Sequence, residues 1–162
     1  MKLCSNSKSY SVLCASEETC GAVGLDIRRS MLLYVTLGTN DLYRARHFYD
    51  AVLPVLGYRG QRYSEEEIGY AADGDTRCRF WVVTPFNRRR ATTGNGSMVA
   101  FEAQTRAAVD AFHAAAIAAG ATDEGEPGLR SYHAHFYAAY VRDLDGNKLC
   151  AVCEKAEEPP FT

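Results

Sequence analysis

The stretch YVTLGTNDLYRARHFY, residues 34–49, places a strand signal directly before a helix signal. The segment Leu32–Leu37 is rich in β-branched and aromatic residues, which favour an extended backbone. Asp41 can cap a helix, and the apolar residues that follow it recur at helical spacing. Gly57 suits the end of that helix, which we place near Leu53 because the next residue is a proline. The stretch therefore predicts a β-strand followed by an α-helix.

The rest of the chain continues this pattern and then repeats it. Further β-rich stretches follow the helix, and the second half again reads strand, helix and three strands, with Thr105 as the helix cap. The two halves align at an offset of 64 residues, the separation of Val35 from Val99, which also puts Phe48 on Phe112. The strands predicted after the first are residues 59–63, 69–72, 78–83, 98–103, 122–126, 136–141 and 148–153.

The repeat predicts an α+β fold in which two βαβββ modules form a cup-shaped mixed sheet with the helices outside. The modules span about residues 31–86 and 97–154, within a single domain at residues 31–154. Residues 1–30 contain no apolar run long enough for a signal-peptide core or a membrane span, so we expect a disordered extension. Residues 155–162 form a short tail.

Composition and charge narrow the possible partners. Hydrophobic residues make up 47% of the 162 and charged residues 23%, which is typical of one globular domain. A net charge of -2 gives no general attraction to nucleic acid or anionic membranes, and we expect neither as a partner. The basic run Arg88–Arg90 is interpreted as a solvated loop. Cys150 and Cys153 lie three apart on a predicted strand, facing opposite sides, which favours buried thiols in a reducing cytoplasm.

Two stretches resemble one known family. Residues 34–49, with Leu56 and Gly57 closing the helix, are similar to the first strand and helix of the glyoxalase/bleomycin-resistance/dioxygenase (vicinal oxygen chelate) superfamily. FYAAYVRDLDGNKLC, residues 136–150, is similar to the closing hairpin of that superfamily, with Leu144 in place of its usual proline. The resemblance covers about residues 31–154, and it implies the fold without specifying a substrate.

The resemblance also implies where metal-dependent members hold their ligands. These are His or Glu residues on the inward face, from the first and last strand of each module. The matching positions here are Tyr34, Met98, Cys150 and a position near Trp81. Divalent hard cations prefer imidazole and carboxylate donors, so we expect no metal or other cofactor. A divalent metal held elsewhere is the alternative.

Strand alternation from those four positions predicts an apolar and aromatic inward face. The face would comprise Tyr34, Thr36, Trp81, Val83, Met98, Ala100, Cys150 and Val152. Such a lining suits an aromatic or amphipathic small molecule, fixed by a few polar groups. The alternative is that these side chains fill the cup as core. The predicted ligand-binding residues are Tyr34, Thr36, Trp81, Met98, Tyr137, Arg142 and Cys150.

Two histidines are the candidates for catalysis. His133 and His135 lie in a polar and aromatic stretch that leads into a predicted strand. In an extended segment both rings would lie on one side, where they could hold a metal or act as general base. The competing interpretation is two exposed imidazoles at the rim. His47 and His113 lie on predicted helices among charged neighbours and are interpreted as surface residues.

Three functions remain open at this point. The first is a cytoplasmic small-molecule-binding protein of the superfamily that lacks the usual metal ligands and forms a homodimer. The second is an enzyme, either a glyoxalase-like lyase or isomerase or a dioxygenase-type enzyme, that uses His133 or His135. The third is an interaction module whose sheet edges only build dimers. Fold alone does not decide whether the chain is an enzyme.

Overall fold

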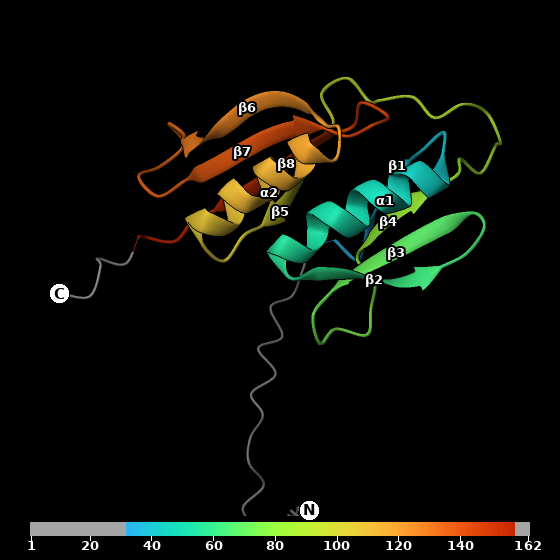
Figure 1. Ribbon diagram of the computed structural model, residues 1–162, viewed down its shortest axis with the longest axis horizontal. Coiled ribbons are helices and arrows are strands. Elements are labelled where there is room, and N and C mark those ends of the chain that lie inside the picture. The colour runs from blue at the N-terminus through green and yellow to red at the C-terminus, as the bar shows by residue number, and fades with distance from the viewer. Residues whose placement is uncertain (1–31, 158–162) are drawn as a thin grey trace, which may run out of the picture. The chain divides into compact units, whose positions relative to one another are not determined.

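A computed structural model describes residues 32–157 of the chain (Figure 1). The predicted N-terminal extension and residues 158–162 of the predicted tail lie outside the described residues. Within the described range, the elements follow the order strand, helix and three strands, twice.

The first half forms a four-stranded sheet with the order β1-β4-β3-β2. Strands β1 and β4 are parallel, and the other neighbours are antiparallel. The side chain of Asp41 accepts a hydrogen bond from the Arg44 amide at 2.9 Å, which confirms the predicted helix cap. A 3₁₀ turn containing Pro54 follows the helix, and Gly57 ends it with a φ of 80°. The elements are β1 (Val35–Gly38), α1 (Leu42–Val52), η1 (Leu53–Leu56), β2 (Tyr58–Tyr63), β3 (Glu67–Ala72) and β4 (Phe80–Val83).

The second half forms an equivalent sheet with the order β5-β8-β7-β6. Thr105 caps the helix by accepting a hydrogen bond from the Ala108 amide at 3.1 Å. Gly146 adopts a φ of 87° in the turn before the last strand, as the Asp-Gly sequence predicts. The elements are β5 (Val99–Glu102), α2 (Arg106–Ala118), β6 (Thr122–Leu129), β7 (Tyr137–Arg142) and β8 (Lys148–Cys153). The predicted α+β fold of two βαβββ modules is confirmed.

Strand register makes the equivalence of the two halves exact to the residue. Thr36 pairs with Trp81 in the first sheet, and Ala100 pairs with Cys150 in the second. Trp81 and Cys150 are therefore equivalent positions, although the loops before them differ in length. The predicted position near Trp81 is therefore Trp81 itself, if it is defined as the counterpart of Cys150.

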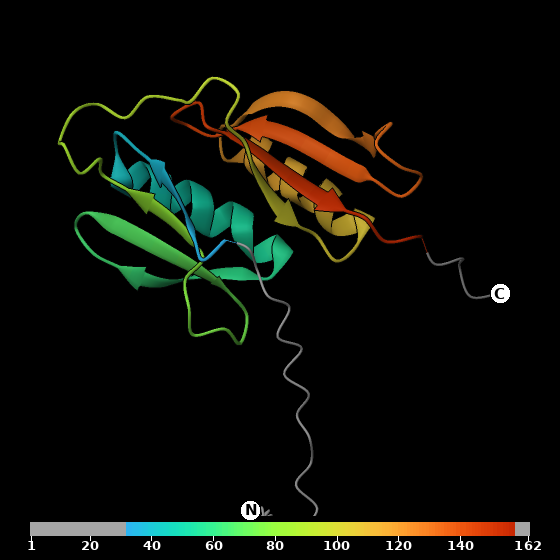
Figure 2. The same ribbon diagram turned by 180° about the vertical axis from the view of Figure 1, so that it is seen from behind.

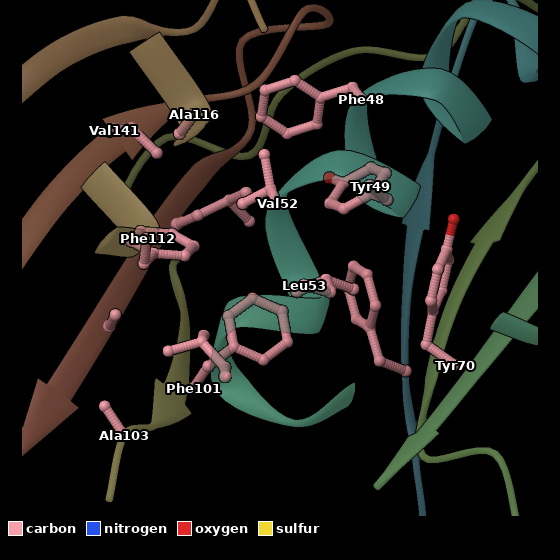
Figure 3. Packing of buried hydrophobic residues seen from close by; sticks show 14 of the residues in the cluster. Phe48, Tyr49, Val52, Leu53, Tyr70, Phe101, Ala103, Phe112, Ala116 and Val141 are labelled. Carbon is pink, nitrogen blue, oxygen red and sulfur yellow. The ribbon is translucent and has the colours of Figure 1, made fainter. Parts of the chain in front are cut away.

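Both helices cover the same side of the two sheets, and one hydrophobic core lies between them (Figures 1 and 3). Phe48 of α1 is 2% exposed and its counterpart Phe112 of α2 is fully buried. The rings of Phe80 and Phe101, one from each sheet, meet edge to face with centroids 5.1 Å apart. Burial of each such side chain contributes about 1.5–3 kcal/mol to folding. The two modules therefore share a core and are not independent.

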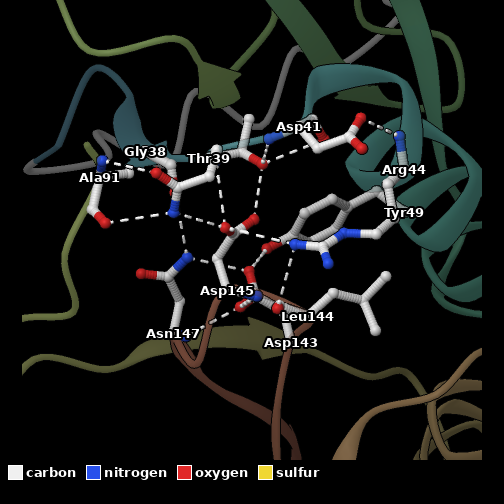
Figure 4. A network of polar contacts seen from close by, with 11 residues as sticks. Gly38, Thr39, Asp41, Arg44, Tyr49, Ala91, Asp143, Leu144, Asp145 and Asn147 are labelled. Atoms are coloured by element: carbon white, nitrogen blue, oxygen red, sulfur yellow. Dashed lines mark hydrogen bonds and ion pairs between the residues drawn. The ribbon is translucent and has the colours of Figure 1, made fainter. Parts of the chain in front are cut away.

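A polar network also joins the halves (Figure 4). The Thr39 hydroxyl donates to Asp145 Oδ2 at 2.5 Å, and the Asn40 side-chain amide donates to Asp145 Oδ1 at 2.8 Å. Asp145 is only 6% exposed at its side chain. Partial burial opposes ionisation, but the hydrogen bonds from Thr39 and Asn40 outweigh it and hold the pKa of Asp145 below its usual value. The turn that closes the second sheet thus anchors the loop between β1 and α1.

Asp143 stabilises the same turn through hydrogen bonds to its backbone amides. Its carboxylate accepts hydrogen bonds from the amides of Asp145 and Asn147 at 2.9 and 2.8 Å, and from the Tyr49 hydroxyl of α1 at 2.5 Å. The Leu144 carbonyl, at the position where the superfamily usually has proline, accepts from Arg44 at 3.2 Å. The contact uses the backbone, so leucine serves as well as proline.

Candidate functional site

Each sheet has one face that packs on the helices and one face that does not (Figure 2). Strand alternation places Val35, Phe80 and Val82 in the core, so the residues between them point to the helix-free face. The predicted inward set is therefore correct in its orientation. It comprises Tyr34, Thr36, Trp81 and Val83 in the first half, and Met98, Ala100, Cys150 and Val152 in the second.

The helix-free face of the first sheet is hollowed. A cavity of about 960 Å³ lies over it and is bounded by strand residues and by the loops around β4. We call this the first-sheet hollow. Its lining includes the predicted Tyr34, Thr36 and Trp81, together with Arg62, Arg77, Cys78 and Phe86.

A row of four paired residues crosses the floor of the first-sheet hollow. Arg62 of β2 pairs with Gly69 of β3, Gly69 with Trp81 of β4, and Trp81 with Thr36 of β1. A Cβ placed on Gly69 would lie 2.8 Å from two ring carbons of Trp81 and 2.8 Å from Cys78 Sγ. The indole therefore lies across Gly69, in space that any other residue would fill. The absence of a side chain on Gly69 thus makes room for the indole in the floor.

The charges around the first-sheet hollow are only partly paired. Arg88 forms an ion pair with Glu66 at its rim. The side chains of Arg62 and Arg77 are exposed and form no ion pair with any residue in the range 32–157. Burial raises the pKa of the Cys78 thiol, although the positive charge of Arg62 opposes the rise. The hollow thus combines an aromatic floor with two unpaired cations.

The equivalent row of the second sheet is filled differently. Gly125 pairs with Tyr140, Tyr140 with Cys150, and Cys150 with Ala100. The guanidinium of Arg130 lies 5.2 Å from the Tyr140 ring centroid and donates to the carbonyls of Glu126 and Ala138. Cys150 is 1% exposed, and burial raises the pKa of its thiol to about 11.

The other predicted ligand-binding residues lie apart from the first-sheet hollow. Met98 lines a groove of about 370 Å³ between β1 and β5, which it shares with Thr36. Arg142 is bound to the Glu124 carboxylate and the Gly146 carbonyl. Tyr137 lies on the helix side of its sheet, where its hydroxyl donates to Asp110 at 2.8 Å. Tyr137 therefore does not share a face with the other candidates.

Among the residues of the first-sheet hollow that the sequence interpretation missed are Arg62, Arg77 and Cys78. Arg62 is the residue that β2 contributes to the row, and a β-bulge between Gly60 and Arg62 sets its side. Simple alternation along β2 does not predict that side. The sequence feature that could have indicated Arg62 is a charged residue on one predicted strand together with a glycine on the next strand.

The two candidate histidines lie in the turn between β6 and β7. The expectation of an extended segment is wrong, because residues 131–135 turn back and the Arg130 amide donates to the Phe136 carbonyl at 2.8 Å. His133 Nε2 lies 3.1 Å from Glu154 Oε1. The His135 amide donates to His133 Nδ1 at 3.2 Å. The rings are thus not presented side by side on one strand face.

Two features are absent from the described residues. Among residues 32–157, no three His, Cys, Asp or Glu side chains are grouped so that they could hold a metal ion. In the same range, none of the helices has the length and apolar character needed to cross a membrane.

Comparison with known proteins identifies the family. Residues 31–151 match the model of the Glyoxalase/Bleomycin resistance protein/Dioxygenase superfamily. The chain belongs to this superfamily. A crystal structure of a glyoxalase/bleomycin resistance protein from Albidiferax ferrireducens is 42% identical, with a TM-score of 0.70, over 78% of this chain and all of that one.

More distant members of the superfamily share the fold alone. A glyoxalase/bleomycin resistance protein/dioxygenase family enzyme from Burkholderia phytofirmans is 24% identical, with a TM-score of 0.60, over 76% of this chain and 99% of that chain. The fosfomycin resistance protein FosX from Listeria monocytogenes is 17% identical, with a TM-score of 0.56, over 78% of this chain and 94% of that chain. No curated protein matches this chain.

Proposed function

We propose that this chain is a small-molecule-binding member of the superfamily, and that it takes an aromatic or amphipathic ligand in the first-sheet hollow. The observation that carries the proposal is the indole of Trp81, which lies across Gly69 on the floor of a cavity of about 960 Å³. A concave site with an aromatic surface and a few polar groups is the usual form of a small-molecule site. Thr36 supplies a hydroxyl at one end of the floor.

The proposal includes binding without a metal, on the chemistry of the residues at the superfamily's ligand positions. Trp81 and Met98 offer a divalent hard cation no suitable donor, and Tyr34 offers neither an imidazole nor a carboxylate. Cys150 is buried, and its pKa of about 11 keeps the thiol protonated. The residues at these four positions therefore do not fit the divalent metal ion of the metal-dependent members.

The proposed setting is a homodimer in the cytoplasm. Phe86 is fully exposed at the rim of the first-sheet hollow, and Tyr34 and Met98 are about half exposed. A second copy over these side chains would remove apolar surface from water. Cys78, Cys150 and Cys153 are free thiols, which supports a reducing compartment. Sedimentation velocity of the protein and of Phe86→Asp tests the dimer, and a monomer in both would contradict it.

One contact favours an enzyme as the second candidate. The carboxylate of Glu154 lies 3.1 Å from His133 Nε2, where it can orient the imidazole. This pair could move a proton in a glyoxalase-like lyase or isomerase. Turnover of the methylglyoxal–glutathione hemithioacetal, with and without added Ni²⁺ or Zn²⁺, tests it. The enzyme hypothesis expects a rate that His133→Gln abolishes and that His135→Gln retains.

Binding is tested directly through the intrinsic fluorescence of Trp81, because it is the only tryptophan in the chain. A screen of aromatic and aliphatic small molecules should give compounds that change its emission and raise the melting temperature together. Tyr140→Phe, on the second sheet, should bind them unchanged. The proposal is wrong if no compound changes the emission, or if the purified chain holds one divalent ion whose removal abolishes binding.

A further inference from the structure

We infer that the ligand of the first-sheet hollow is a planar aromatic acid, whose ring stacks on Trp81 and whose carboxylate binds Arg62 and Arg77. This inference rests on the proposed function and names the class of ligand. It follows from three features of the hollow: the orientation of the indole, the pairing of the charges and the order of residues along the strands.

The orientation of the indole favours a flat ligand. The edge carbons of Trp81 extend over Gly69, toward the strand that carries Arg62. The edge of the indole and the Cys78 sulfur occupy the space over Gly69 that a side chain would fill, and Trp81 lines the cavity. A planar ring can stack on the indole, because the stacking of two aromatic rings adds to the free energy gained by burial. A bulky aliphatic group cannot match that contact.

The pairing of the charges favours an anion. The hollow is lined by Arg62, Arg77 and Arg88 and by Glu66 and Glu67. Arg88 and Glu66 pair with each other. The remaining lining charges are two cations and one carboxylate, which leaves an excess of one positive charge. Asp75 also interacts with Arg77 and Cys78, but it forms its ion pair with Arg79. A guanidinium binds a carboxylate through paired hydrogen bonds, which makes a carboxylic acid the matching partner.

The strand register places the charges at different ends of the floor. Glu67 pairs with Val83, whereas Gly69 pairs with Trp81, so Glu67 lies one step beyond the indole along β3. Arg77 precedes Cys78, whose sulfur lies beside the same indole edge as Gly69. Arg62 lies opposite Gly69 and close enough to Cys78 to affect the pKa of its thiol. A carboxylate at the Arg62 and Arg77 end thus lies away from Glu67.

The second sheet carries no equivalent site, because its arginine already has partners. Arg130 stacks on Tyr140 and donates to two backbone carbonyls. Lys148 and Arg142 both bind the Glu124 carboxylate. Within residues 32–157, the first-sheet hollow is therefore the place where unpaired cations face a cavity with an aromatic floor.

The test uses four probes on the full chain, three of which share the same naphthyl group. They are 2-naphthoate, its neutral amide 2-naphthamide, the cationic 2-naphthylmethylamine and the non-aromatic cyclohexanecarboxylate. Isothermal titration calorimetry gives the affinities, and Trp81 emission reports contact with the floor. We expect 2-naphthoate to bind about tenfold more tightly than each of the others, because the amide and the amine lack the charge-assisted carboxylate contact and cyclohexanecarboxylate lacks the aromatic ring that stacks on Trp81.

Two variants and a matched control locate the carboxylate. Arg62→Gln and Arg77→Gln should each reduce the preference for naphthoate over naphthamide to about threefold or less. Arg59→Gln is the control, because Arg59 lies on the same strand but pairs with Asp73 and does not line the hollow. It should keep the full preference. Circular dichroism confirms that all three variants are folded.

Each other outcome overturns a defined part of the argument. Equal binding of naphthoate and naphthamide, or unchanged preference in both arginine variants, contradicts the aromatic acid but keeps the hollow as a binding site. Tighter binding of the amine points to Glu67 and contradicts the assignment. Binding of cyclohexanecarboxylate as tight as naphthoate contradicts stacking. If no probe binds and no screened compound shifts Trp81 emission, the proposed function fails as well.

Discussion

The two sheets of this molecule have the same strand order, and β1, β4 and β3 match β5, β8 and β7 in register, but their helix-free faces carry opposite patterns. In the first sheet the large residue of the central row is Trp81, and its neighbour on the next strand is Gly69. In the second sheet the equivalents are Cys150 and Tyr140, so the small residue and the large residue are exchanged. Each large ring lies against a glycine of a neighbouring strand, Trp81 against Gly69 and Tyr140 against Gly125, but Tyr140 is also covered by the guanidinium of Arg130.

This contrast shows that the repeat conserves a scaffold and not a site. The helix-facing sides of both sheets bury comparable residues, because a shared core requires them. The helix-free sides are under no such requirement and have diverged. One forms a hollow with unpaired cations. On the other, Arg130 and Arg142 bind local acceptors, although the Nε of Arg130 is buried without a hydrogen-bond partner. Function in such a duplicated fold can therefore be carried by one half.

The largest expected effect tests whether both halves depend on the shared core. Phe48→Ala and Phe112→Ala should each lower the free energy of unfolding by about 3–5 kcal/mol, because both rings are buried in the same cluster. Urea unfolding measures both. A loss below about 1 kcal/mol in one variant would show that its half does not share the core.

The next effect tests the polar network between the halves. Asp145→Asn keeps the shape but removes the charge that accepts from Thr39 and Asn40, which should cost about 1–3 kcal/mol of unfolding free energy. The folded-state pKa of Asp145 is lowered, so its contribution is present above the unfolded pKa and is lost as pH falls through the folded value. The two proteins should therefore begin to converge in stability as pH falls below the unfolded value of about 3.9, and they should converge fully only below the lowered folded-state pKa. A difference that stays constant with pH contradicts this role.

A smaller effect sharpens the contrast between the equivalent positions. Trp81→Ala should weaken 2-naphthoate binding about tenfold by calorimetry, through loss of the stacking surface. Cys150→Ala, at the same position of the second sheet, should leave the affinity within about twofold, since Cys150 does not line the first-sheet hollow. Equal losses in both variants would mean that the ligand contacts both sheets.

The smallest effect concerns the two thiols. Cys150 has a pKa of about 11, so at pH 8 only about one thiol in a thousand is ionised, and burial slows reaction further. Cys78 is also buried but lines the first-sheet hollow. Iodoacetamide labelling, followed by peptide mass spectrometry, should modify Cys78 several-fold faster than Cys150. Saturating 2-naphthoate should slow only Cys78, and protection of Cys150 would move the ligand to the second sheet.

Much of the architecture was predictable from local patterns. The caps Asp41 and Thr105, the glycine at position 57 and the Asp-Gly turn each act within a few residues of the chain, and all lie where the sequence places them. Period-two alternation also gave the correct face for Trp81 and Cys150. These features are set by backbone geometry and short-range hydrogen bonds, which the sequence contains directly.

The candidate site was only partly predictable. Tyr34, Thr36 and Trp81 were found because they alternate with core residues on their strands. Tyr137 was placed with them, but its hydroxyl reaches Asp110 of α2 on the opposite face. The histidine segment was taken as extended and is a turn. Both differences arise where a strand begins, since the first residue after a turn has no preceding neighbour to fix its side.

The sequence by itself determined the repeat, the order of the elements and the type of residue at the superfamily's ligand positions. Only the tertiary structure decided that Arg62, Gly69, Trp81 and Thr36 form one row, because that row joins four strands through a register that a bulge shifts. It also decided which arginines are free. The sequence alone does not distinguish Arg130 from Arg62. In the structure, Arg130 donates to two backbone carbonyls and stacks on a tyrosine ring, and Arg62 does neither.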